Sequence, residues 1–219
     1  MPTSQGQDSA PPTVVHLAVY DGLADWEAAL AVAQIRSGTF QHGGATHQVR
    51  TVGSSTTPVT TMGGVTVLPD LALDDLSPDH SAMLIVPGGG GWETGGNREF
   101  VRKGREFLNA GVPVAAICGA TFGFADEGLL DDRAHTGAAA EYLAMTGYKG
   151  GELFHDTDAV NDRGLITAGP TDSVAFAREI IAELRIWEPA VIDAWFRLFS
   201  RGDAVAYGEL MALLQQGSA

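Results

Sequence analysis

The stretch V-P-V-A-A-I-C-G-A-T, residues 112–121, decides the fold that we expect for this chain. Its first part, Val112 to Ile117, is short, apolar and rich in β-branched residues, which is typical of a strand buried on both faces. Cys118 follows directly and opens an apolar segment that we predict to be a helix through Leu130. A buried strand that turns into a helix through small residues is the repeating unit of parallel α/β sheets.

The same alternation of strand and helix extends on both sides of this stretch. We predict further strands at residues 14–20, 45–53, 82–86 and 165–168, a β-hairpin at 60–69 around Gly63-Gly64, and helices at 26–36 (with Asp25 as N-cap), 98–110, 138–145 and 171–184. The sequence therefore predicts an α/β fold in which helices cover both faces of a parallel sheet. In such sheets ligands bind at the carboxyl ends of the strands.

Three segments make up the expected domain organisation. Residues 1–12 are polar and Pro-rich and are expected to form a flexible arm, and residues 13–187 form the α/β domain. Residues 188–219 are expected to add two helices to the same domain, with Trp195, Phe196 and Phe199 on their buried side.

Composition limits the possible partners of the chain. Of 219 residues, 45% are hydrophobic and 18% are charged, which is typical of a globular protein. Acidic residues outnumber basic ones 27 to 13, so the net charge of −14 disfavours nucleic acid and anionic membranes. No apolar run is long enough to span a membrane, and the first twelve residues lack the basic and apolar regions of a signal peptide. We expect a cytoplasmic protein.

Cys118 is the single cysteine of the sequence, so it forms no internal disulfide. At the end of a strand and the start of a helix, its thiol is expected to have a lowered pKa and its backbone a positive φ, as at a nucleophile elbow. The alternative is a small buried hydrophobic residue, because free cysteines are often buried. The residues alone favour neither of these two interpretations.

Other candidate residues are weaker. Glu27 falls in the first turn of a predicted helix, where a carboxylate is usually a solvated partner of the helix dipole. Gly88 to Gly91 allow a close backbone approach but lack the lysine of a phosphate-binding loop. Trp92 is expected to line a small apolar pocket or to belong to the core. His135 is a candidate base, but a lone histidine is more often a core or surface residue with other partners, and we favour that interpretation. The histidines show no metal-ligand spacing, so no metal or cofactor is expected.

Three motifs together resemble one family. They are V-Y-D-G-L-A-D-W-E at residues 19–27, L-I-V-P-G-G-G-G-W at 84–92, and V-A-A-I-C-G-A-T at 114–121. The combination is similar to the DJ-1/PfpI (ThiJ) superfamily, and the stretch 165–184 with the tail resembles its bacterial type 1 glutamine amidotransferase-like subgroup. The resemblance implies a flavodoxin-like, class I glutamine amidotransferase-like fold with extra C-terminal helices.

The resemblance also implies roles for individual residues. Cys118 would be the nucleophile, and Glu27 the acid that contacts its sulfur. Gly89 and Gly119 would donate backbone N–H groups to an oxyanion hole, with Gly88 in the same loop. His135 resembles a histidine that some members carry near the cysteine. A homodimer is implied as well.

Two departures restrict the activity that the resemblance implies. Protease-like members carry a histidine directly after the cysteine, whereas this chain has Gly119. The late His-x-Glu of true glutamine amidotransferases is absent from the sequence. We therefore expect a cysteine-dependent enzyme acting on a small electrophilic substrate in a glyoxalase-, hydratase- or amidase-like reaction. The alternative is a redox sensor or stress-response protein that works through oxidation of Cys118.

Overall fold

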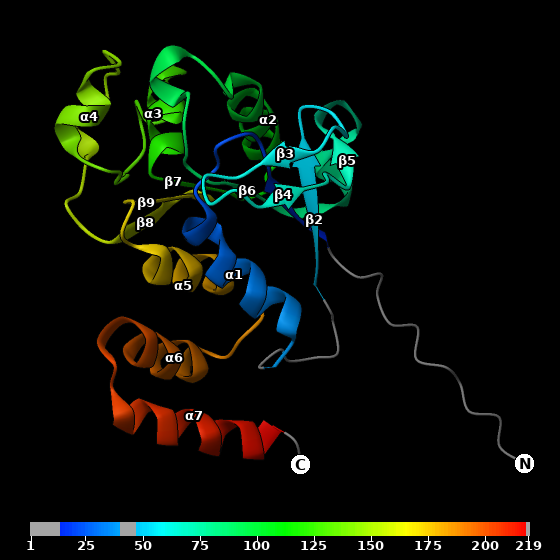
Figure 1. Cartoon of the computed structure of the whole chain (residues 1–219). Helices are drawn as coiled ribbons and strands as arrows, with labels where there is room; N and C mark the ends of the chain where they lie inside the picture. Colours follow the sequence, from blue (N-terminus) through cyan, green and yellow to red (C-terminus); the bar gives the residue numbers. More distant parts are fainter. Residues whose placement is uncertain (1–13, 40–46, 218–219) are drawn as a thin grey trace, which may run out of the picture.

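A seven-stranded sheet lies at the centre of the computed structural model, which describes residues 14–39 and 47–217 (Figure 1). The predicted arm at residues 1–12 lies outside the described residues. The strand order is β5-β2-β1-β6-β7-β9-β8. The strands are β1 (Val14–Ala18), β2 (Gln48–Gly53), β5 (Leu71–Ala72), β6 (Ser81–Val86), β7 (Val114–Ile117), β8 (Ala159–Asp162) and β9 (Leu165–Ala168), and β3 (Val59–Thr60) pairs with β4 (Thr66–Val67) as the predicted separate hairpin.

The sheet is parallel except at one edge. The expected parallel sheet is present, and β8 alone runs antiparallel to its neighbour, β9, among the seven strands described. The two strands are joined through Arg163 and Gly164, whose φ angles of 51° and 79° both fall in the left-handed region. Two consecutive residues with positive φ form the turn that suits a tight hairpin, so the chain reverses instead of crossing over.

Helices cover both faces of the sheet, as predicted. α1 (Asp25–Ser37) and α5 (Ser173–Glu183) lie side by side on one face, and α2 (Arg98–Asn109) and α3 (Gly119–Asp126) lie on the other (Figure 1). β7 shows why this strand is apolar throughout: Val114 and Ala116 pack with the core under α2 and α3, whereas Ala115 and Ile117 pack with the core under α1 and α5.

The C-terminal region forms two helices, as the sequence predicts. α6 (Pro189–Arg201) packs on α5, and α7 (Ala204–Gly217) packs on α6, so the two helices form successive layers beyond α5 (Figure 1). Trp195 is buried against Trp187, but Phe199 is 46% exposed and does not belong to the buried side as we expected. No helix in the described part of the chain is both long and apolar enough to span a bilayer.

Two further expectations about helix ends are wrong. α1 begins at Asp25 with Ala24 as its N-cap, and the Asp25 carboxylate accepts hydrogen bonds from Thr61 Oγ1 (2.5 Å) and the Gly63 N–H (2.7 Å) in the hairpin instead. α3 ends at Asp126 and not at Leu130, because Gly128 takes a φ of 73° that the helix cannot contain.

Candidate active site

The candidate site lies where the carboxyl ends of β1, β6 and β7 meet. Three loops reach this edge: the turn at Gly22, which leads into α1, the loop at Gly88 after β6, and Cys118 after β7. Backbone hydrogen bonds join the first two loops, because Ala24 N–H donates to Gly88 O (3.0 Å) and Gly90 N–H donates to Gly22 O (3.2 Å). Parallel topology therefore brings residues from three distant parts of the sequence to one place.

Cys118 has the strained backbone that the sequence predicts. Its φ of 56° and ψ of −123° lie in a region that residues other than glycine rarely occupy. The strain is held from both sides: Cys118 N–H donates to Ala168 O (3.0 Å), and Cys118 O accepts from Thr121 N–H (3.0 Å) and Thr121 Oγ1 (2.6 Å). Backbone strain that the surroundings hold in place is a feature of functional sites.

Glu27 is fully buried in the first turn of α1, where the usual solvated carboxylate would be exposed. Its Oε2 accepts a 2.5 Å hydrogen bond from the Gly88 N–H, and its Oε1 accepts none of ordinary geometry from the described residues. The Cys118 thiol and the Gly88 N–H both act to lower the pKa of this carboxyl. Burial raises the pKa of Glu27 to about 7, so near neutral pH this carboxyl both holds and releases a proton.

Gly88 is the point at which the site residues converge. A Cβ at this position would lie 2.8 Å from Cys118 Cβ, 2.8 Å from Glu27 Oε2 and 2.8 Å from the Gly119 nitrogen. The loop therefore needs glycine here because three groups occupy the space that a side chain would take. Its N–H is engaged by Glu27 and so is not free for a substrate oxyanion.

The thiol does not have the lowered pKa that we expected from its place at a helix start. Burial raises the pKa of Cys118 to about 12, and the nearby Glu27 carboxyl acts in the same direction. The Gly119 N–H donates to the sulfur and opposes this shift, but its effect is smaller. Near neutral pH, the buried pair of Cys118 and Glu27 therefore holds more protons than the same two groups would hold in solvent.

The remaining glycines differ in what the structure places around them. The Gly119 N–H points to the Cys118 sulfur, where it stabilises a thiolate. Gly89 forms a β-bridge with Leu23, and a Cβ on it would lie 2.8 Å from Leu23 Cα. An oxyanion role for Gly89 and Gly119 stays a prediction.

Trp92 is buried and lines one side of the site. Its indole Nε1 donates to Tyr20 Oη (3.1 Å), which in turn donates to Pro87 O (2.5 Å) at the start of the glycine loop. The ring lies along α3, with Cδ1 only 2.7 Å from where a Cβ on Gly119 would be. Trp26 is different: it is 52% exposed and donates to Pro170 O (3.2 Å) across the end of β9.

His135 does not join the other candidates. Its ring is fully buried, with Nδ1 at 2.8 Å from Arg133 O and Nε2 at 3.0 Å from Tyr148 Oη. Both nitrogens therefore have partners other than Cys118 or Glu27, and burial lowers the pKa of the ring. His135 holds the loop before α4 (Ala140–Ala144) in place, and the structure does not present it as a base for the thiol.

Sequence reasoning missed a pair of side chains beside the thiol. Tyr142 on α4 donates a 2.6 Å hydrogen bond to Glu93 Oε1, and the Tyr142 ring packs on Phe122 of α3 at 4.9 Å between centroids. Glu93 raises the pKa of Cys118, so its charge is felt at the sulfur. Its position directly after Trp92 was the available signal, whereas nothing local marks Tyr142.

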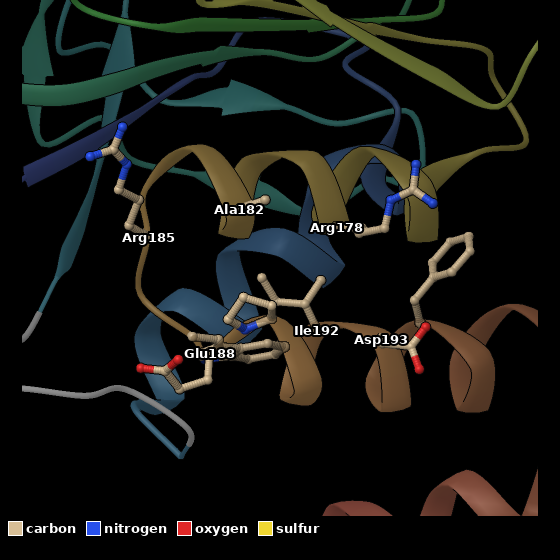
Figure 2. A pocket seen from close by; sticks show the side chains of 9 residues that line it. Arg178, Ala182, Arg185, Glu188, Ile192 and Asp193 are labelled. Atoms are coloured by element: carbon tan, nitrogen blue, oxygen red, sulfur yellow. The ribbon is translucent and has the colours of Figure 1, made fainter.

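A well-formed cavity lies away from this site. It has a volume of about 550 Å³ between α5 and α6, with Arg178 and Arg185 on the α5 side and Glu188 and Asp193 on the α6 side (Figure 2). α5 starts at the carboxyl end of β9, so the end of α5 that carries Arg185 lies towards the opposite edge of the sheet. The cavity contains neither Cys118 nor Glu27.

Comparison with solved structures supports this fold. A thiJ/pfpI family protein from Bacillus anthracis superposes with a TM-score of 0.86 at 32% identity, covering 94% of this chain and 98% of that one.

Comparison with known sequences extends the likeness to named proteins. "Uncharacterized protease YoaZ" of Bacillus subtilis is 34% identical over 90% of this chain and 95% of that protein. "Glutathione-independent glyoxalase DJR-1.2" of Caenorhabditis elegans is 27% identical over 63% of this chain and 73% of its own length. "Protein/nucleic acid deglycase 2" of Escherichia coli is 30% identical over 54% of this chain and 70% of its own length. The profile of the DJ-1/PfpI family matches residues 13–183, and the chain belongs to the DJ-1/PfpI family.

Proposed function

We propose that this protein is a cysteine-dependent enzyme that acts on a small molecule with an electrophilic carbon, with Cys118 as nucleophile and Glu27 as proton acceptor and donor. The convergence of Cys118, Glu27 and Gly119 on Gly88 carries the proposal. A strained cysteine beside a buried carboxyl with a pKa of about 7 pairs a nucleophile with an acid–base group.

The raised pKa of the thiol assigns a definite task to Glu27. Because burial keeps Cys118 protonated at neutral pH, the thiol must lose its proton as it attacks, and the ionised Glu27 carboxylate is the adjacent acceptor. With a carbonyl substrate, the sulfur–carbon bond forms while the carbonyl π electrons move to oxygen. Glu27 then returns the proton to that oxygen, which gives a neutral thiohemiacetal.

The named activities of the relatives support chemistry at an electrophilic carbon. A carbonyl substrate is favoured over a peptide, because Gly119 follows the cysteine and His135 has other partners. Without an adjacent histidine the thiol lacks the base that cysteine proteases use.

The test is consumption of methylglyoxal, an isonitrile and a simple amide by wild type, Cys118→Ser, Glu27→Gln and Glu188→Gln. Glu27→Gln keeps a hydrogen-bonding side chain but removes proton transfer, so the rate should fall by about 10²–10⁴. Glu188 is an exposed glutamate near the opposite edge of the sheet, and its variant should keep the wild-type rate. Full activity in Cys118→Ser would refute the proposal.

A redox sensor remains the second candidate, because the thiol is partly exposed and Glu27 in its protonated form can donate to an oxidised sulfur. The raised thiol pKa weighs against it, since peroxide attacks the thiolate. Intact mass after peroxide separates the two: oxidation of Cys118 with no turnover of any electrophile would favour the sensor.

A further inference from the structure

The carboxylate of Glu93 has a fixed position beside the thiol. Trp92, the preceding residue, is held by its hydrogen bond to Tyr20 and by its packing along α3 at Gly119 and Gly123. Glu93 itself is exposed, so its side chain leaves the buried loop at the surface next to the cysteine turn. The backbone that carries this charge is therefore part of the same rigid unit as Cys118.

Tyr142 holds the free end of the Glu93 side chain. Its hydroxyl donates to Glu93 Oε1 at 2.6 Å, across 49 residues of sequence. The Tyr142 ring is itself fixed against Phe122, which lies one turn after Cys118 on α3. The hydrogen bond from Tyr142 therefore fixes the carboxylate at the surface of the protein, where its charge acts on the Cys118 thiol.

The charged side chains that act on the thiol are acidic. The charged groups that act on the Cys118 pKa are Glu27 and Glu93, both carboxyls, and both raise it. Among residues 14–39 and 47–217, no lysine or arginine forms an ion pair with Glu93.

A neighbouring cavity of about 800 Å³ continues this pattern. It is bordered by Gly169, the residue after the Ala168 carbonyl that binds the Cys118 N–H. The charged side chains of its lining are all acidic: Glu141, Asp156, Asp158 and Asp172. An anion that enters this cavity meets no compensating positive charge from its lining.

We propose that Glu93, positioned by Tyr142, makes this site reject anionic electrophiles, so that its substrate is an uncharged or cationic electrophile. That the selected molecule is a substrate rests on the proposed function. The charge selectivity itself is a property of the thiol and its neighbours and does not need turnover. Carboxylate-bearing electrophiles such as 2-oxo acids are thereby excluded, whereas neutral aldehydes, neutral amides and electrophiles with an amino group are admitted. Glu93 acts here as a specificity-determining residue and Tyr142 as a positioning residue.

The test uses two alkylating reagents of nearly the same shape, iodoacetamide and iodoacetate, on the native protein. Cys118 is the single cysteine, so intact mass reports its alkylation alone. The rate ratio of the neutral to the anionic reagent is compared with the ratio for mercaptoethanol at the same pH. We call the protein ratio divided by the mercaptoethanol ratio the double ratio. Both reagents react with the same thiolate, so the thiolate fraction cancels and a change in the thiol pKa does not affect the double ratio.

In wild type the double ratio should be about 10. Glu93→Gln should lower it about 3- to 10-fold, which is the size of effect expected when one carboxylate repels an anionic reagent across a short, partly screened distance. Tyr142→Phe keeps the ring packing and should give a smaller decrease, because it releases the carboxylate without removing it. Glu188→Gln removes the same charge from the region of the α5–α6 cavity and should leave the ratio unchanged. High salt should reduce the wild-type ratio towards that of Glu93→Gln.

Three results would overturn the inference. The first is an unchanged ratio in Glu93→Gln, and the second is an equal shift in Glu188→Gln, which would indicate net charge alone. The third is a thiol that neither reagent reaches in the native protein. Since alkylation needs no turnover, a shifted ratio in a protein that consumes no electrophile would reject the enzyme and leave the charge selectivity standing.

Discussion

Glu27 is fully buried with one carboxyl oxygen on the Gly88 N–H, and this placement links its proton to folding. Its pKa in the folded protein, about 7, lies above the ordinary value of 4.5. The folded state therefore favours the protonated form, so the contribution of Glu27 to stability is fully present below pH 4.5. It is lost as the pH rises through 7.

The variant Glu27→Gln cannot ionise and should escape this loss. We expect the stability of Glu27→Gln relative to wild type to increase by about 3 kcal/mol between pH 4.5 and pH 8.5. Urea unfolding at the two pH values measures this difference, with the exposed Glu188→Gln as control. A difference that does not change with pH would show that Glu27 is ionised throughout.

Gly88 offers a second prediction at the residue scale. In Gly88→Ala the new Cβ would lie 2.8 Å from both Cys118 Cβ and Glu27 Oε2, so we expect a loss of about 1–3 kcal/mol of stability and a changed alkylation rate of Cys118. Gly90, two residues later, has open space around it and provides the matched control. Equal unfolding midpoints for Gly88→Ala and Gly90→Ala would contradict the convergence of the site on Gly88.

The sequence allows part of the site to be predicted residue by residue. The place of Cys118 follows from a strand-to-helix turn, which is local and readable in sequence, whereas the role of Glu27 is implied only by the family resemblance. The direction of the thiol pKa does not follow, because burial by groups from other loops outweighs the local helix start. Tyr142 was missed for the same reason, since its bond to Glu93 spans 49 residues.

Among the secondary-structure elements, the β3–β4 hairpin depends on α1. The Asp25 carboxylate accepts from Thr61 Oγ1 and from the Gly63 N–H, and the Thr60 N–H donates to Asp21 Oδ1 (2.8 Å). The bonds from Thr61 and Gly63 lower the pKa of Asp25. All three bonds tie the hairpin to the segment that carries Glu27 into the site.

Removing this carboxylate should loosen the hairpin without unfolding the helix. In Asp25→Ala we expect faster amide hydrogen exchange at Gly63 and its neighbours, with α1 protection nearly unchanged because Ala24 is the N-cap. Asp74→Ala, which changes an exposed aspartate in the 3-10 helix η1 (Leu73–Asp75), serves as control. Unchanged exchange at Gly63 would mean that the hairpin is held by other contacts.

Element boundaries show where local sequence signals are sufficient. β9 was predicted to the residue, because an apolar run between turn residues leaves few choices. The sequence does not predict β8, because none of its four residues is buried and its pairing depends on the turn at Arg163-Gly164. The strand-and-helix order of the fold was therefore readable, whereas the antiparallel edge needed the three-dimensional context.

For the whole molecule, association remains a prediction. We expect a homodimer, although Trp195, one basis of that expectation, is buried within its own chain. Exposed apolar side chains remain on the C-terminal helices at Phe199, Val205 and Tyr207. Because each chain carries a net charge of −14, two copies repel each other and any dimer must bury apolar surface to offset this repulsion.

Sedimentation velocity at micromolar concentration tests the dimer directly. We expect a species near twice the 22.9 kDa chain, and its fraction should rise with salt, because screening weakens the repulsion while apolar burial persists. The triple variant with serine at positions 199, 205 and 207 should dissociate, whereas serine at the exposed Met62, Val65 and Leu68 of the hairpin region provides the matched comparison. If only the variant at Met62, Val65 and Leu68 loses the dimer, the interface lies beside Asp25 and the candidate site. A single species near the monomer mass in all three proteins would reject association.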